Sequence, residues 1–136
     1  MNTQSNDKYL LLFRGNDWHK DLSPEEMQSI AGQWMAWFNR LTEQGKAVAG
    51  NPLKGEGKLV SGKQGRVVAD GPFAESKEAI GGYFLLHVRS LDEAVSIARE
   101  CPGLAYGVKV EVRPVAEECP LAAEARTEAQ FAHANH

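Results

Sequence analysis

The sequence predicts an α+β domain with a ferredoxin-like βαββαβ order and an extra β-hairpin in the middle. Three observations support this fold class. The apolar runs at residues 8–13 (KYLLLF) and 83–88 (YFLLHV) are typical of strands buried on both faces of a sheet. Each run is followed by a helix start signal and an amphipathic helical pattern. Residues 108–115 (VKVEVRPV) alternate between valine and charged side chains, as expected for a half-buried or edge strand.

The first helix is predicted to begin at Ser23. Proline follows at the first helical position and Glu26 lies three residues after the serine, which together form a capping box. Apolar residues then recur every three or four positions on one helix face: Met27, Ile30, Ala31, Trp34, Trp37, Phe38 and Leu41. We interpret the three aromatic residues of this stripe as core residues rather than as an aromatic binding box. Gly45 is well placed to end the helix.

Further strands are predicted between the two helices. Residues 46–53 (KAVAGNPL) indicate a short strand running into a turn, and residues 57–70 (GKLVSGKQGRVVAD) indicate two strands around a Gly-Lys-Gln-Gly loop. A second capping box at residues 90–93 (SLDE) starts the second helix. Its predicted apolar face consists of Leu91, Ala94, Val95 and Ala98. It ends before Pro102, because a proline disfavours helical geometry at the preceding residue.

Length and composition indicate one globular domain. The chain has 136 residues, of which 43% are hydrophobic and 24% charged, so it can bury a core without disulfides or metals. We expect residues 1–7 to be disordered, residues 8–115 to form the domain, and residues 116–136 to form a tail with helical propensity. The net charge of −3 and the scattered basic residues argue against a nucleic-acid partner.

The cysteines, the N-terminus and the apolar runs indicate where the protein is located and whether it binds a metal or another cofactor. Cys101 and Cys119 lack metal-site spacing, so no metal is predicted. The polar N-terminus lacks the apolar segment of a secretory signal. No apolar run approaches the roughly 20 residues that a membrane helix needs. We therefore expect a cytoplasmic protein with no membrane partner and no cofactor.

A homodimer follows from the predicted layers. Two helices cover only one face of a four-stranded sheet, while the apolar strands place further apolar side chains on the other face. A symmetric dimer that packs sheet on sheet covers them. The space between two such sheets is a natural pocket for a small-molecule ligand.

The main candidate site residues lie in residues 67–88 (VVADGPFAESKEAIGGYFLLHV). Asp70 has two open interpretations. Its carboxylate either accepts backbone N–H bonds in a turn or points into the pocket as a base or ligand contact. Gly71 permits unusual backbone angles and Pro72 fixes φ, while Phe73 is expected to enter the core.

Arg14 and His87 complete the candidate set. His87 lies inside the second apolar strand, and it is either a hydrogen-bonded structural histidine or, on the barrel side, the best placed titrating group of the chain. Arg14 ends the first strand and can pair with Asp70 or Glu75. His19 lies on a loop that can cover the mouth of the pocket.

The stretch DGPFAESKEAIGGYFLLHVRSLDEAVSIARECPG, followed by VEVRPV, strongly resembles the DGPF-type branch of the YCII-related family. The resemblance extends from KYLLLF to VEVRPV. It implies a ferredoxin-like dimeric α/β barrel. Some bacterial relatives are encoded beside, or fused to, sigma factors of the extracytoplasmic-function type, which implies a sensing or stress role and a sigma-factor-type partner.

One branch of the wider superfamily looks enzymatic and carries a proposed catalytic dyad. It has a histidine in the first helix and an aspartate near the end of that helix. An ungapped alignment on the glycine and proline after the helix places these positions at Trp34 and Glu43. Because an indole ring cannot act as a general base, the dyad is not carried over to this chain.

The sequence therefore favours a dimer that binds a small molecule or has a regulatory role linked to sigma-factor or stress systems. The alternative is a cofactor-independent enzyme that uses Asp70 and His87 as acid/base groups. A purely structural dimer domain is a third interpretation, and whether the protein is an enzyme stays open. The candidate ligand-binding residues are Arg14, Asp70, Gly71, Pro72, Phe73 and His87.

Overall fold

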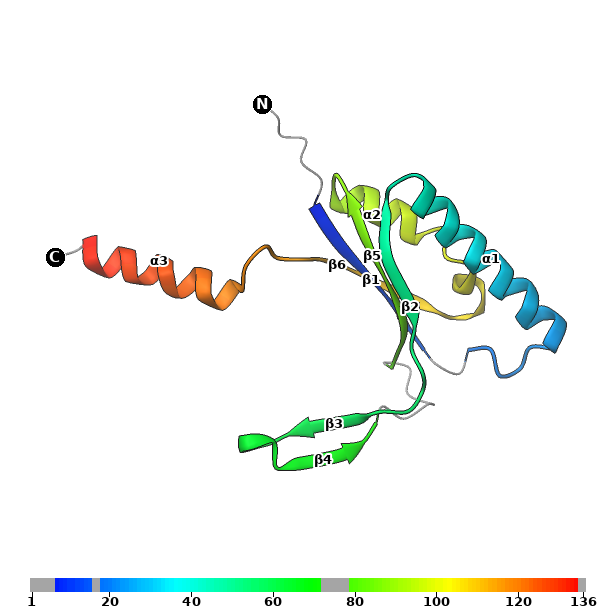
Figure 1. The fold of residues 1–136 in the computed structure, drawn as a ribbon, viewed down its shortest axis with the longest axis horizontal. Helices are drawn as coiled ribbons and strands as arrows, with labels where there is room; N and C mark the ends of the chain where they lie inside the picture. Colours follow the sequence, from blue (N-terminus) through cyan, green and yellow to red (C-terminus); the bar gives the residue numbers. More distant parts are fainter. Residues whose placement is uncertain (1–6, 16–17, 72–78, 135–136) are drawn as a thin grey trace.

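The computed structural model describes residues 7–15, 18–71 and 79–134, with side chains as far as residue 131. The elements in these ranges, in chain order, are β1 (Asp7–Arg14), α1 (Pro24–Glu43), β2 (Ala47–Pro52), β3 (Lys58–Ser61), η1 (Lys63–Gly65), β4 (Val67–Asp70), β5 (Ile80–Val88), α2 (Leu91–Ala98), η2 (Pro102–Tyr106), β6 (Lys109–Pro114) and α3 (Pro120–Ala134). Figure 1 shows their arrangement. No helix within the described ranges is long and apolar enough to cross a membrane.

Four strands form an antiparallel sheet in the order β2-β5-β1-β6. β1 is central, and Leu11 pairs with Phe84 of β5 on one side and with Val112 of β6 on the other. The remaining two strands, β3 and β4, form a separate two-stranded sheet inserted between β2 and β5. This is the ferredoxin-like order with an extra hairpin, so the predicted fold class is confirmed.

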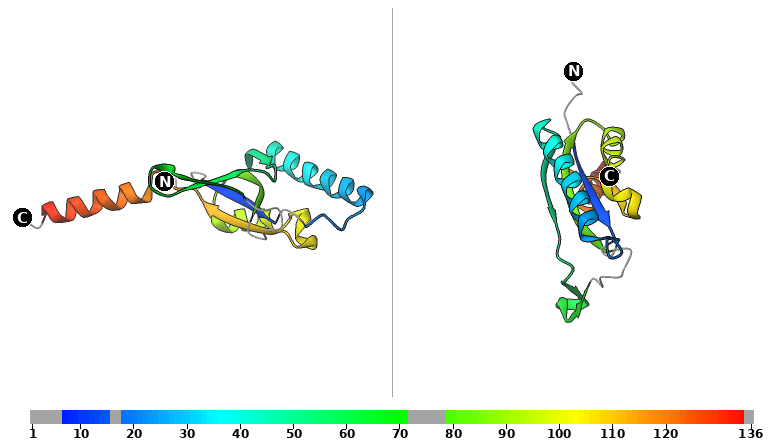
Figure 2. Two further views of the ribbon diagram at one scale, coloured as in Figure 1. Left: turned by 90° about the horizontal axis from the view of Figure 1, so that it is seen from below. Right: turned by 90° about the vertical axis from the view of Figure 1, so that its right-hand side faces the viewer.

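The sheet has one covered face and one uncovered face. On β1, Tyr9, Leu11 and Phe13 are buried, whereas the alternate residues Leu10 and Leu12 are only half-buried. Helices α1 and α2 both lie on the covered side (Figure 2), and among the described residues no helix covers the other side. We call this uncovered surface the open face; it carries Leu10, Leu12 and Arg14 of β1, Tyr83, Leu85 and His87 of β5, and Glu111 and Arg113 of β6.

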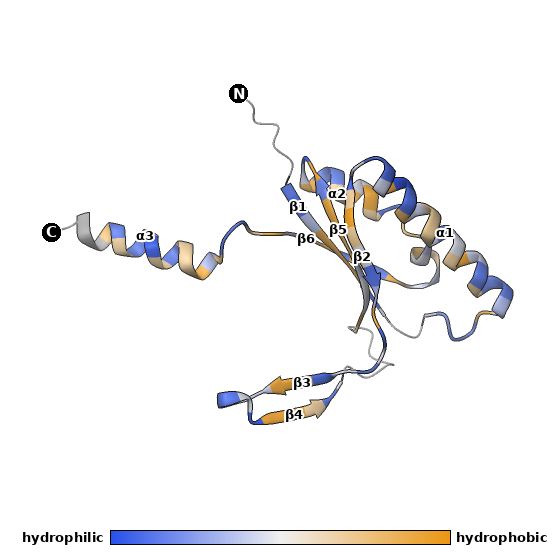
Figure 3. Ribbon diagram, viewed as in Figure 1, coloured by the Kyte–Doolittle hydropathy of each residue, from blue (hydrophilic) through white to orange (hydrophobic). Residues whose placement is uncertain are grey.

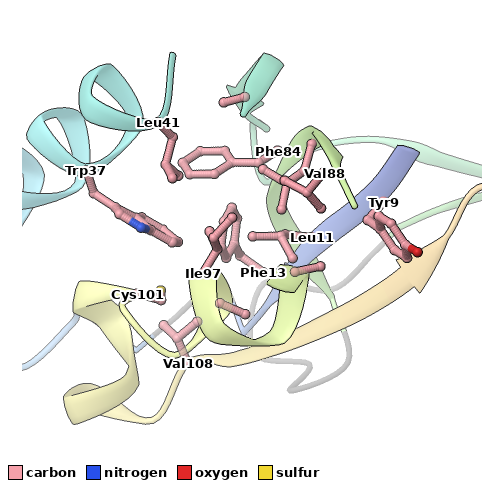
Figure 4. Packing of buried hydrophobic residues seen from close by; sticks show 14 residues of the cluster. Tyr9, Leu11, Phe13, Trp37, Leu41, Phe84, Val88, Ile97, Cys101 and Val108 are labelled. Atoms are coloured by element: carbon pink, nitrogen blue, oxygen red, sulfur yellow. The ribbon is translucent and has the colours of Figure 1, made fainter. Parts of the chain in front are cut away.

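The core fills the space between the sheet and the two helices (Figure 4). Its centre is aromatic. The ring of Phe84 lies 4.9 Å from the ring of Phe13 and 4.9 Å from that of Trp37, measured between centroids. Trp37 and Leu41 from α1 and Ile97 from α2 close the core from the helix side. The interpretation of Trp37 as a core residue is thus confirmed.

Both helices begin at the predicted serines. At α1 the Ser23 hydroxyl accepts from the backbone N–H of Glu26 at 3.1 Å, and the Glu26 carboxylate accepts from the backbone N–H of Ser23 at 2.9 Å. At α2 only half of the box forms. The Ser90 hydroxyl accepts from the N–H of Glu93, but the Glu93 carboxylate accepts from the N–H of Arg89 instead. This backbone hydrogen bond is the main cause that lowers the pKa of Glu93.

The buried face of α2 differs from the prediction. Ala94, Ile97 and Ala98 are buried, whereas Leu91 and Val95 are exposed. The predicted and observed faces share the two alanines and differ by a rotation of the helix about its axis. In a helix of eight residues the spacing alone does not separate the two faces. Cys101 is also buried and continues the spacing of Ile97 and Ala98. It therefore indicates that the face with these two residues is the buried one.

The two cysteines are free thiols in contrasting surroundings. Cys119 is exposed, whereas Cys101 is buried, and burial raises the pKa of the Cys101 thiol to about 11. Because the thiolate is the reactive species, Ellman's reagent at pH 8 is expected to label one thiol per native chain and a second only in guanidinium. A Cys119→Ser control should show no rapid labelling. Two rapidly labelled thiols in the native protein would contradict this burial.

Two elements extend away from the sheet and its helices, namely the β3–β4 hairpin and α3 (Figure 1). We call the hairpin, residues 58–70, the arm. The chain leaves the sheet for the arm at Pro52, which pairs with Gly82 of β5. The backbone N–H of Gly71 donates to the carbonyl oxygen of Gly57 at 3.1 Å and closes the base of the arm. The predicted hairpin at this position is therefore confirmed.

Candidate functional site

A cavity of about 530 Å³ lies between α1 and the sheet, at the end of the sheet where β5 begins. β1, β2 and β5 supply one side of it, α1 supplies the other, and the loop after β1 adds three residues. The lining residues are Phe13, Gly15, Trp18, His19, Met27, Ile30, Ala31, Trp34, Met35, Phe38, Gly50, Asn51, Pro52, Gly81, Gly82 and Phe84. The cavity is on the covered side of the sheet, not between two sheets as the sequence predicted for the ligand pocket.

Aromatic rings form most of the cavity wall. Trp18 and Trp34 are stacked, with ring centroids 6.0 Å apart and an angle of 28° between their planes. Phe13 meets Trp34 edge-on at 5.0 Å, and Phe38 lies 4.8 Å from Phe84. Such rings bind flat apolar groups by stacking and edge contacts. The wall can therefore hold a planar ligand with little need for charge.

Two glycines of the cavity wall lie in close contact with neighbouring groups. A Cβ atom on Gly50 would lie only 2.8 Å from ring atoms of Phe38 and Phe84, and one on Gly82 would lie 3.1 Å from the carbonyl oxygen of Asn51. Side chains at either position would occupy the cavity or displace its wall. Gly82 belongs to β5, which begins three residues earlier than predicted. Residues 72–78, shortly before this strand, lie outside the described residues.

The apolar stripe of α1 divides between core and cavity. Trp37 and Leu41 are buried in the core, but Trp34 and Phe38 are only half-buried and line the cavity. These two rings also pack against the core, so the interpretation of them as core residues is confirmed in part. The sequence signal for a close contact here is Gly50 of β2, which lies against the rings of Phe38 and Phe84.

Polar side chains at the cavity are few. His19 and Asn51 line it, from the loop after β1 and from β2. The ring of His19 lies 5.3 Å from that of Trp18. An imidazole and an amide both donate and accept hydrogen bonds, so these two residues can orient a ligand that carries a hydroxyl or carbonyl group.

The described members of the predicted ligand set do not line this cavity. Arg14 lies on the open face, where its Nε donates to Oε1 of Glu111 at 2.9 Å. Arg113 also donates to Glu111, at 3.2 Å, so two guanidinium groups lower the pKa of that carboxyl. These residues form a small ion-pair network on the open face.

Asp70 and Gly71 lie at the base of the arm. The Asp70 side chain is 81% exposed and pairs with the ammonium group of Lys58, its partner across the hairpin. Gly71 is buried, and a Cβ atom there would lie 2.9 Å from the Leu59 side chain. Pro72 and Phe73 lie outside the described residues. The role of this set as a site stays a prediction.

Within one chain, Asp70 and His87 lie far apart. His87 is on the open face, where it pairs in register with Lys8. The arm leaves the sheet opposite Gly82, five residues from His87 along β5, which is about 17 Å at the rise of a strand. The arm then extends away from the sheet (Figure 1).

Comparisons with known proteins give a matching family model and a relative. The family model of the YCII-related domain matches residues 8–119. "Uncharacterized protein R00369" of Rhizobium meliloti (strain 1021) is 45% identical over 51 residues, which are 37% of this chain and 41% of that protein. The chain thus matches less than half of the length of this relative.

A solved structure resembles the chain more loosely. It is the 5-chloro-2-hydroxyhydroquinone dehydrochlorinase from Burkholderia phenoliruptrix AC1100 in complex with 2,5-dihydroxybenzoquinone. The TM-score is 0.42 at 17% identity, and the match covers 82% of this chain and 95% of that one. A likeness at this level does not transfer that activity to the chain.

Proposed function

The chain belongs to the YCII-related domain family, and we propose that it binds a small, flat and largely apolar molecule in the cavity between α1 and the sheet. The observation that carries this proposal is the set of aromatic rings that line this cavity. The volume, about 530 Å³, falls within the range of roughly 300–1,000 Å³ that is usual for ligand pockets. His19 and Asn51 would orient one polar group of the ligand.

The proposal includes a homodimer that packs open face on open face. Leu10, Leu12 and Leu85 supply apolar area there, and in a single chain they remain half-buried. A second copy would remove this area from water, which is the main favourable term in association. A sigma-factor-type partner and a cytoplasmic location rest on the sequence alone and stay predictions.

The cavity can be tested by filling it from an exposed position. Ala31 is exposed on α1 and lines the cavity, whereas Ala36 is exposed on the same helix and does not line it. We expect 2-naphthol, a planar probe with one hydroxyl, to bind the wild type with a measurable heat by calorimetry and to raise its melting temperature. Ala31→Phe should weaken binding about tenfold or more, a change of about 1.4 kcal/mol. Ala36→Phe should bind as the wild type does.

The same titration distinguishes probe binding in the cavity from probe binding at the site predicted around Asp70 and His87. Asp70→Asn and His87→Ala change residues that do not line the cavity, so both should bind 2-naphthol like the wild type. Loss of binding in these two variants, with Ala31→Phe unaffected, would move the site to the open face and favour the acid/base enzyme. Absence of saturable binding by 2-naphthol and by a panel of one- and two-ring aromatics would contradict the proposal.

A further inference from the structure

The arm exposes apolar side chains on both of its faces. The register places Val60 opposite Val68 on one face and Leu59 opposite Ala69 on the other. Val60 is 65% exposed, Val68 61% and Leu59 57%, and Figure 3 shows the hydrophobic colouring of both strands. An isolated two-stranded hairpin is marginally stable in water unless something packs on it. Exposed aliphatic side chains on both faces therefore mark the arm as a docking element.

α3 is a second element that the other described residues leave largely uncovered. Leu121 is 74% exposed and Phe131 70%. In Figure 1 the arm and α3 both extend on the side away from α1 and α2, which is the side of the open face. The open face thus lies between two projecting elements that each expose apolar side chains.

The charges of the two elements are complementary. Lys63 and Arg66 lie in the loop at the tip of the arm. Glu124 and Glu128 lie on α3 four residues apart, a spacing that places them on one side of the helix. A basic tip and the acidic side of α3 on the same chain attract each other between two copies.

We propose that the arm and α3 clasp a second copy of this chain, with the arm of each copy packing against α3 of the other. This inference rests on the homodimer proposed above and adds the elements that hold it together. In a two-fold dimer the contact is made twice, because each surface is used by both copies. The same contact would cover the exposed aliphatic side chains of the arm and the exposed Leu121 and Phe131.

Sedimentation velocity over a range of protein concentrations tests the apolar part of the contact. Val60→Asp combined with Val68→Asp should raise the dimer dissociation constant about tenfold or more, because two carboxylates would lose water on docking. Val95→Asp is the matched control, since Val95 is an exposed valine on α2, on the covered side of the sheet. An unchanged dissociation constant in the arm variant would overturn the inference.

A charge exchange tests the pairing of the arm with α3. Lys63→Glu with Arg66→Glu should weaken the dimer, and adding Glu124→Lys with Glu128→Lys should restore it. A fourfold variant that remains as weak as the double variant would contradict this pairing. The attraction should also fall as the salt concentration rises.

A third variant tests whether the homodimer depends on the open face rather than on the arms. Leu12→Asp places a charge on the open face. A dimer lost in Leu12→Asp but unchanged in Val60→Asp/Val68→Asp would overturn the role of the arms and leave the homodimer standing. A wild type that sediments as a monomer at every concentration would overturn both, without bearing on ligand binding in the cavity. Circular dichroism confirms that each variant keeps its helices.

Discussion

Replacing Gly50 by alanine is expected to destabilise the protein by about 1–3 kcal/mol and to weaken ligand binding in the cavity. The new methyl group would lie 2.8 Å from ring atoms of Phe38 and Phe84 and 3.0 Å from the carbonyl oxygen of Tyr83. The backbone of a paired strand has little freedom to move, so the rings must shift. Because Phe38 lines the cavity, its shift changes the shape of the binding site.

Gly32→Ala is the matched control for this prediction. Gly32 lies in α1, and a Cβ atom there would meet nothing within 4 Å. Alanine in a helix interior is more stable than glycine by roughly 0.5–1 kcal/mol. The same substitution should therefore change the free energy of unfolding with opposite signs at the two positions, as measured in urea. Equal stability of Gly50→Ala and the wild type would show that the rings relax without cost.

Phe84→Ala is expected to lower the free energy of unfolding by about 3–5 kcal/mol. Phe84 is buried, and its ring lies within 4.9 Å of the rings of Phe13, Trp37 and Phe38. Truncation removes contacts with both the central strand and the long helix, and the surrounding rings cannot close the space. Small domains have only about 5–15 kcal/mol of stability, so a large part of it would be lost.

The measurement is urea unfolding of wild type and variant at one protein concentration, because a dimer would make stability depend on concentration. Leu104→Ala serves as the control, since Leu104 is 42% exposed on η2 and its truncation leaves no buried space. Its effect should be small. A cost at Phe84 no greater than that at Leu104 would show that the aromatic centre is not the main support of the fold.

The sequence predicted those elements whose signal is local. The capping box at Ser23, the alternation in β6 and the turn glycines of the arm each depend on neighbours within a few residues, and each appears in the structure. The order of these elements was then sufficient for the fold class, because few sheet topologies accommodate it. The face of α2 was less predictable, since Ile97 and Val95 both fit the spacing.

The cavity could not be found from local patterns alone. A helical stripe indicates which side of α1 faces inward, but the side chains opposite it decide whether Trp34 fills the core or borders a space. Those opposite residues come from other parts of the chain, since Gly50 of β2 lies against Phe38 and Gly103 of η2 lies against Trp34. For the same reason, Asp70 and His87, only 17 positions apart in the sequence, lie on separate parts of the chain.

The central place of β1 has a consequence for synthesis on the ribosome. Both sheet partners of this N-terminal strand come late in the chain, from residues 80–88 and 109–114. During translation β1 therefore emerges with two unpaired edges. These edges stay unpaired until β5 and β6 have been synthesised. Helix α1, whose hydrogen bonds are local, can form as soon as it has been synthesised, whereas the sheet cannot. Conditions that slow elongation should thus prolong the exposure of an aggregation-prone strand.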